Sequence, residues 1–172
     1  MSGSAPQMNI FGFQDTDIPL APPFAVILCN IFTVFLAKGP LKWKMPLFPP
    51  ETTTLKKRLV VASVFAAAIA YQFYLCKVSL HSTGSGIAFT PVEGITRSGP
   101  YAYSRNPLYL QFFVEIIPLM AYISNSRWVF FWHFPVMLLY LTMVVVPAEE
   151  AFLLKHHAST YTDYYNTVPR WF

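Results

Sequence analysis

The sequence has little charge and few cysteines. Only 12% of its 172 residues are Asp, Glu, Lys or Arg, about half the share of an ordinary soluble domain. Two cysteines are too few for a disulfide-stapled fold. Hydrophobic residues make up 55% of the chain, which excludes an intrinsically disordered protein. The composition therefore predicts an integral membrane protein with room for one domain.

A dense basic stripe is also absent. The chain carries 12 Lys and Arg against 8 Asp and Glu, a formal net charge of +4. These basic residues are thinly spread, whereas a nucleic-acid surface clusters Lys and Arg with polar side chains that contact bases. We therefore expect membrane lipids as partners and no nucleic acid.

Four apolar stretches predict an all-helical bundle of about four transmembrane helices. A helix needs about 20 residues to cross a hydrocarbon core, and the third stretch is short for this. Strands are disfavoured because a membrane barrel needs many alternating segments of about ten residues. A polar turn at 124–127 separates the third and fourth stretches and predicts a C-terminal helical hairpin. The four stretches are Leu20–Ala37, Leu59–Cys76, Leu108–Ile123 and Trp128–Pro147.

A cluster of polar and aromatic residues lies just before the third stretch, in the run GITRSGPYAYSRNPLY from Gly94 to Tyr109. Pro107 fits the first turn of a helix, and Asn106 fits its N-cap. The crowding of Arg105 among tyrosines has two interpretations. Aromatic rings and Arg form ordinary anchors at a membrane interface, but the same side chains could line a binding site.

A second polar cluster, Glu149-Glu150, follows the fourth stretch. Carboxylates are unfavourable at a helix C-terminus, where the helix dipole is negative. If the helix continues past Pro147, one carboxylate faces the bundle and the other faces water. A metal site with His156 and His157 is not expected, because no third ligand stands at a matching spacing.

Together these motifs resemble the membrane-embedded methyltransferases, which include isoprenylcysteine carboxyl methyltransferases and phospholipid methyltransferases. The resemblance covers residues 94–172, the proposed cofactor-binding region, whereas residues 1–93 would supply an N-terminal tail and two spans. Two departures exist: the family often has His at the position of Asn106, and isoprenylcysteine-type members carry a basic residue where this chain has valines before Pro147. The pieces that match are GPYAYSRNPLY, the hairpin, Glu149-Glu150, Tyr161-x-x-Tyr164 and Val168-Pro169-Arg170.

The resemblance implies an S-adenosylmethionine-dependent enzyme acting on a lipid or lipidated acceptor. Arg105 or Arg170 would hold an acceptor carboxylate. An acceptor amine must lose a proton, which Glu149, Glu150 or the intramembrane Glu115 would accept. A polar tail with a short helix around 159–166 would close over the cofactor. An alternative is a non-catalytic relative that serves as an accessory subunit of a larger membrane complex. The residues implied at the cofactor are Gly94, Ile95, Thr96, Tyr101, Asn106, Pro107, Tyr109 and Glu149.

The sequence does not determine which membrane holds the chain or on which side of that membrane each loop lies. Six Lys and Arg in the first loop would place that loop in the cytoplasm. Four spans would then put residues 94–107 and the tail on the opposite face, away from a cytosolic cofactor. Either one stretch does not cross, or the charge bias misleads, or the host is the endoplasmic reticulum or another organelle membrane.

Glu115 stands within the third stretch, four residues after Gln111, so the two share one helix face. An ionisable residue at that depth is a functional candidate. The alternative interpretation is a neutral carboxyl that is hydrogen-bonded within the bundle.

Overall fold

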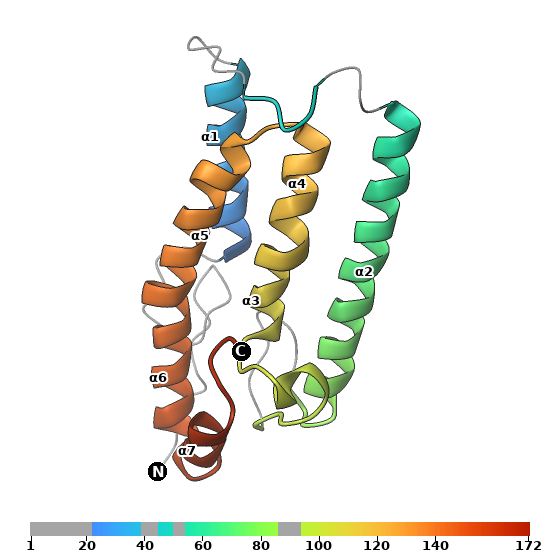
Figure 1. Ribbon diagram of the computed structural model, residues 1–172. Coiled ribbons are helices and arrows are strands. Elements are labelled where there is room, and N and C mark those ends of the chain that lie inside the picture. Colours follow the sequence, from blue (N-terminus) through green and yellow to red (C-terminus); the bar gives the residue numbers. More distant parts are fainter. Residues whose placement is uncertain (1–21, 39–44, 50–53, 86–93) are drawn as a thin grey trace. The chain divides into compact units, whose positions relative to one another are not determined.

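The computed structural model describes residues 22–38, 45–49, 54–85 and 94–172. Every regular element in these ranges is helical, and no strand occurs in them. The predicted all-helical class is therefore confirmed. The elements are α1 (Pro22–Lys38), α2 (Leu55–His81), η2 (Gly99–Ala102), α3 (Pro107–Gln111), η3 (Phe112–Ile116), α4 (Ile117–Ser124), η4 (Val129–His133), α5 (Phe134–Tyr140), η5 (Leu141–Val145), α6 (Val146–His156) and α7 (Ala158–Thr167) (Figure 1).

Three helices are long and apolar enough to cross a membrane: Leu55–His81, Pro107–Ser124 and Val129–His156. The first predicted stretch gives α1, whose apolar part, Phe24–Leu36, is shorter than these three. A fourth crossing therefore stays a prediction. The start of that stretch, 20–21, lies outside the described residues.

The last long helix runs on through Pro147 to His156, so it does not end where the apolar stretch ends. Pro147 lies in the first turn of α6, directly after the π-helical turn η5. A proline inside a helix lacks one N–H and clashes with the preceding turn. A π turn widens the backbone by one residue, and so gives the ring room without breaking the helix.

The same arrangement occurs twice more. Pro118 is the second residue after the π turn η3, and Pro135 is the second residue after η4. In η3 the N–H of Ile117 bonds the carbonyl of Phe112, five residues back. Each interior proline of these two long helices thus follows a local widening, which keeps an apolar segment helical through a residue that would otherwise interrupt it.

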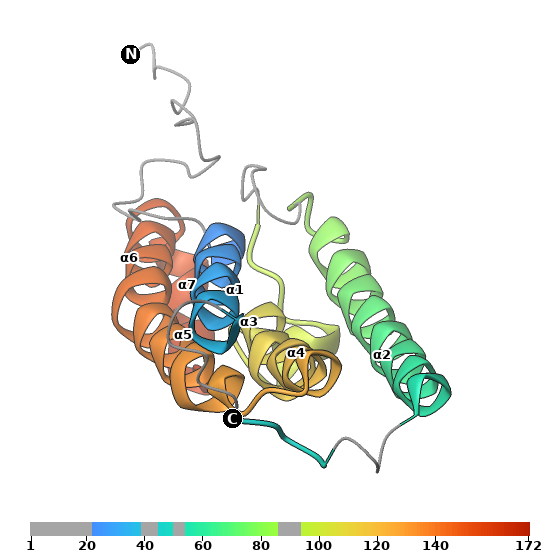
Figure 2. The same ribbon diagram turned by 90° about the horizontal axis from the view of Figure 1, so that it is seen from above.

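Contacts divide the described chain into two compact units. One comprises Pro22–Gln72 and Leu108–Tyr140. Within it, η4 packs against both α1 and α4, and α1 also contacts α5 (Figure 2). The ring of Phe32 lies 4.7 Å from that of Trp132 between α1 and η4.

The turn after α4 in this unit is fixed by Asn125, which has a left-handed φ of 47°. Its side-chain oxygen accepts a hydrogen bond from the Phe48 N–H at 2.8 Å, and its amide donates to the Phe48 carbonyl at 3.0 Å. Residues 45–49 are thereby attached to the turn, and the N–H of Arg127 adds a bond to the carbonyl of Met45 at 2.8 Å.

The other unit contains Phe73–Pro107 and Leu141–Phe172 among the described residues. In it α7 packs on α6, and His157 breaks the helix between them with φ −131° and ψ 33°. The predicted short tail helix is therefore present as Ala158–Thr167. The two compact units do not test the predicted boundary between residues 1–93 and the cofactor-binding region 94–172, which stays a prediction.

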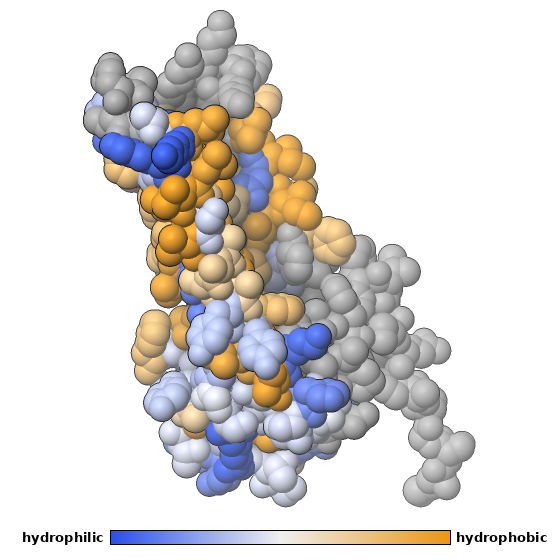
Figure 3. All heavy atoms as spheres, turned by 90° about the vertical axis from the view of Figure 1, so that its right-hand side faces the viewer, coloured by the Kyte–Doolittle hydropathy of each residue, from blue (hydrophilic) through white to orange (hydrophobic). Residues whose placement is uncertain are grey.

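The surface of α2 is mostly apolar along its length. Figure 3 shows hydrophobic side chains over this helix below a basic first turn formed by Lys56, Lys57 and Arg58. Lys77 and His81 lie near its other end. Basic residues at both ends of an apolar helix suit a segment whose ends lie at the two membrane surfaces.

Candidate functional site

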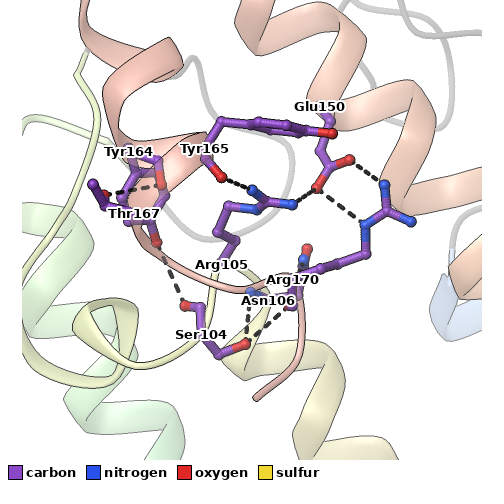
Figure 4. A network of polar contacts seen from close by, with 8 residues as sticks. All are labelled: Ser104, Arg105, Asn106, Glu150, Tyr164, Tyr165, Thr167 and Arg170. Atoms are coloured by element: carbon purple, nitrogen blue, oxygen red, sulfur yellow. Dashed lines mark hydrogen bonds and ion pairs between the residues drawn. The ribbon is translucent and has the colours of Figure 1, made fainter.

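The centre of the second unit is one carboxylate held by two arginines. Glu150 accepts a hydrogen bond from Arg105 Nη2 on Oε1 at 2.8 Å. Arg170 donates to the same carboxylate from Nη2, to Oε2 at 2.5 Å, and from Nε, to Oε1 at 3.2 Å (Figure 4). The side chains of Arg105 and Glu150 are each 8% exposed. The three residues predicted to be catalytic are therefore brought together in one cluster, in which Arg105 and Glu150 are buried and Arg170 is partly exposed.

The backbone around these side chains holds the two segments in register. The N–H of Arg105 donates to the carbonyl of Pro169 at 3.0 Å. The next carbonyl, of Arg170, accepts from the hydroxyl of Ser104 at 3.1 Å and from the side-chain amide of Asn106 at 3.0 Å. The predicted Asn106 is thus part of the cluster, because it fixes the backbone of the residue that binds Glu150.

Tyr165 covers the Arg105 guanidinium. The guanidinium carbon lies 4.0 Å from the centre of the ring, a cation–π contact, and Arg105 Nη1 also bonds the Tyr165 carbonyl. Arg105 Nε makes no hydrogen bond within the described ranges, although it is buried. One donor of a nearly inaccessible cation is therefore left without an acceptor.

Tyr164, on α7, closes the other side of the cluster. Its hydroxyl donates to the carbonyl of Tyr101 at 2.8 Å, and Ser104 O lies at 3.4 Å. Burial raises the pKa of Tyr164 to about 12, with Arg105 and Arg97 acting in the opposite direction. Burial also raises the pKa of Tyr101, and the charges that add to this rise include Glu149.

A more exposed set of contacts lies at the edge of this unit. Arg97 forms an ion pair with Asp163 and bonds the carbonyl of Thr160, and its guanidinium lies 5.8 Å from the centre of the Tyr164 ring. These contacts attach the segment before η2 to α7. Because the side chains of Arg97 and Asp163 are 42% and 65% exposed, the pair adds little stability.

Gly94 and Thr96 contact the turn that follows α2. The hydroxyl of Ser85 donates to the carbonyl of Gly94 at 2.9 Å, and Thr96 Oγ1 lies 2.7 Å from Thr83 Oγ1. A Cβ at Gly94 would stand 3.1 Å from the Thr83 carbonyl, which explains the small residue. Ile95 is half-buried between them. A role for these three residues in cofactor binding stays a prediction.

The remaining predicted residues are divided between the two units. Pro107 is buried at the first position of α3, as its fixed φ favours. Glu149 is half-buried on α6 beside the buried Glu150, so the pair of carboxylates does separate into a more and a less buried member. Tyr109 belongs to the first unit, where its ring stacks on Phe112 at 6.5 Å.

Ser104 and Tyr165 were not identified as site residues from the sequence. A signal for the tyrosines exists: Tyr161, Tyr164 and Tyr165 have the i, i+3, i+4 spacing that places side chains on one helix face. Ser104 has no such signal, because its role depends on a carbonyl far along the chain.

Within the described ranges, no group of three metal-binding side chains gathers. Comparisons of the chain with protein-family models, with curated proteins and with solved structures found no match. The chemistry of the site therefore follows from its own residues. Two guanidinium groups face one carboxylate, so these three side chains carry a net charge of +1 and suit the binding of an anionic group.

Proposed function

We propose that this chain is an integral membrane protein and an S-adenosylmethionine-dependent methyltransferase that acts on a lipid or lipidated acceptor. One observation carries the proposal: the segment before one long helix, at Arg105 and Asn106, meets Glu150, which lies in the last part of the next long helix, and Arg170, which follows that helix. The resemblance to membrane-embedded methyltransferases implies a cofactor held between those same two segments.

The residues present fit this cofactor. An amino-acid carboxylate matches the excess guanidinium charge and the unpaired donor Arg105 Nε. Glu149, outside the two-arginine cluster, would accept hydrogen bonds from the cofactor's ammonium or ribose hydroxyls, and Tyr101 and Tyr165 offer aromatic surface. When bound, S-adenosylmethionine supplies an electrophilic methyl group on a sulfonium.

The chain itself would contribute alignment and exclusion of water. Alignment of two reactants is worth roughly 7–11 kcal/mol of a barrier. The bonds from Ser104 and Asn106 to the Arg170 carbonyl fix the backbone on which that alignment depends. Glu150 accepts from arginines on both oxygens, so its role is to position the guanidinium groups.

A second candidate function is a non-catalytic subunit of a larger membrane complex. It is favoured by the same observation, that both oxygens of Glu150 already accept hydrogen bonds from arginines. A carboxylate whose oxygens both accept from arginine forms a structural lock without any ligand. Such a subunit would fold normally, bind no methyl donor and co-purify with other subunits in a fixed ratio.

The test is binding of labelled S-adenosylmethionine to the purified chain in lipid nanodiscs. Glu149→Gln is expected to raise the Kd about tenfold, the equivalent of ~1.4 kcal/mol. Asp163→Asn makes the same acid-to-amide change on the exposed edge of the unit and is expected to leave the Kd unchanged. A folded wild-type chain that binds no methyl donor would contradict the enzyme proposal.

The acceptor is then identified from where the labelled methyl group goes. Membrane lipids and lipidated peptides are incubated with the chain and the labelled donor, and the extract is treated with base. A methyl ester on a carboxylate is hydrolysed to volatile methanol, whereas a methyl group on an amine stays in the lipid. Absence of label from both fractions, with donor binding intact, would contradict the proposed lipid or lipidated acceptor.

A further inference from the structure

Glu115 differs from the other acidic side chains in the described ranges. Glu150 is bound by two arginines and Asp163 by one, and Glu149 has electrostatic partners near the end of the last long helix. Glu115 instead lies inside Pro107–Ser124, one of the helices long and apolar enough to cross a membrane. Carboxyl groups at such depth are costly and generally functional.

The partner of Glu115 is a glutamine rather than a cation. Gln111 Nε2 donates to Glu115 Oε2 at 3.0 Å and to the carbonyl of Ile69 on α2 at 2.7 Å. The residue Gln111 is 4% exposed. Both hydrogens of its amide are therefore committed, one to a backbone carbonyl of the neighbouring helix and one to the carboxyl group.

This hydrogen bond determines where an acid proton can lie. Because Oε2 accepts from Gln111, the proton of a neutral Glu115 is carried by Oε1. No hydrogen bond to Oε1 is formed by the residues that the structure describes. Glu115 is half-buried and its neighbour Val114 is 60% exposed, so this part of the helix reaches the outer surface of its unit.

The backbone at this position is also unusual. Glu115 lies in the π turn η3, Phe112–Ile116, and such turns are often found at functional sites. The turn gives Pro118 room and at the same time sets the face on which Glu115 projects.

We propose that Glu115 is a binding site, open to the membrane, for a lipid-soluble amine that has a free lone pair on nitrogen. The Oε1–H group transfers its proton to the lone pair of the amine nitrogen. The carboxylate formed then accepts an N–H bond from the resulting ammonium group, so both charges are neutralised within the hydrocarbon. Gln111 keeps its bond to Oε2 throughout and holds the carboxyl group in place.

The chemistry selects among ligands. An alcohol has no nitrogen lone pair that is basic enough to take the proton. A quaternary ammonium ion has neither a lone pair nor an N–H group. An amine with a free lone pair, whether primary, secondary or tertiary, both removes the proton and, as its ammonium ion, donates an N–H bond to the carboxylate that remains. This site goes beyond the proposed methyl transfer and does not depend on it.

The experiment uses the full chain in nanodiscs and dicyclohexylcarbodiimide, a lipid-soluble reagent that adds to protonated carboxyl groups. Mass spectrometry of peptides is expected to find the adduct on Glu115. Glu150 serves as an internal control, because both of its oxygens accept hydrogen bonds from arginines, and it is expected to stay unlabelled. Glu115→Gln removes the label and confirms the assignment.

Protection then tests the ligand. Dodecylamine at ten times its Kd is expected to slow the labelling of Glu115 about tenfold, because the free site falls by that factor. Dodecanol and dodecyltrimethylammonium are expected to leave the rate unchanged. An unlabelled Glu115 would show that the carboxyl group is closed to the membrane and would overturn the proposal, as would equal rates with all three compounds. No methyl donor is present, so failure here is separate from failure of the enzyme proposal.

Discussion

The side-chain amide of Asn106 donates a hydrogen bond to the backbone carbonyl of Arg170, 64 residues further along the chain, at 3.0 Å. The Ser104 hydroxyl donates to the same oxygen. An amide N–H is sufficient for this contact, so a titratable imidazole is not required at position 106. The bond connects the start of α3 to the segment after α7 and keeps the Arg170 side chain on Glu150.

The first prediction concerns this shared carbonyl. Asn106→Ala and Ser104→Ala are each expected to lower the free energy of unfolding by about 1 kcal/mol, since one donor remains in either variant. The double variant leaves the carbonyl with neither side-chain donor and is expected to lose more than the sum. Thermal or denaturant unfolding in detergent measures all three. Strict additivity would show that the two donors act independently.

A larger effect is expected at the centre of the cluster. Arg105→Leu leaves Glu150 short of one partner in a buried site, and breaking a buried ion pair costs about 3–5 kcal/mol. Arg105→Lys is expected to rescue little, because an ammonium group lacks the planar fork that contacts Glu150 and lies over Tyr165. The measurement is again unfolding in detergent. Full rescue by lysine would mean that charge alone, without the guanidinium geometry, holds the cluster.

Tyr164 predicts a dependence of stability on alkaline pH. Its pKa is raised from 10.0 to about 12, so the folded chain holds the phenol proton more tightly than the unfolded chain does. Its contribution to stability is complete below pH 10 and is lost as the pH rises toward 12. Tyr164→Phe cannot titrate and is expected to lose less stability over this interval than the wild type. Tyr103, which is 80% exposed, offers a matched Tyr→Phe control that is expected to follow the wild type.

Two substitutions of Asn125 distinguish the contribution of its backbone conformation to stability from that of its side-chain hydrogen bonds. Asn125→Gly keeps the left-handed φ of 47° but removes both bonds to Phe48. Asn125→Ala removes the bonds and also introduces a residue that adopts this conformation at a cost of roughly 1–2 kcal/mol. The alanine variant is therefore expected to unfold at a lower temperature than the glycine variant. Equal melting temperatures would show that the turn relaxes to another φ.

The positions of the long helices could largely be predicted from apolar runs, but their ends could not. The fourth apolar stretch ends at Pro147, and the sequence left open whether the helix continues beyond that residue. The helix continues because η5 accommodates the proline, and α6 then carries polar residues on to His156. No local sequence signal distinguished a proline that ends a helix from one that follows a π turn.

The residues of the site could be predicted in part, but the contacts between them could not. Arg105, Glu150 and Arg170 were identifiable because charged residues are rare in this chain and stand out near the ends of apolar runs. Their pairing depends on the return of the tail after α7, which spacing does not specify. Thr96 was assigned to the cofactor by resemblance, and this role stays a prediction. In the structure its hydroxyl bonds the Thr83 hydroxyl, just after α2, and the Ser79 carbonyl on α2.

The π turns before Pro118, Pro135 and Pro147 have a consequence for deletions. Each turn accommodates one residue more than regular winding would use, and a single added residue turns the following helix by about 100°. Shortening η5 by one residue, together with Pro147→Ala so that no ring needs the wider turn, would remove the surplus while leaving Glu150 facing the same direction. The same deletion placed within α6, between Pro147 and Glu150, would swing the carboxylate away from both arginines.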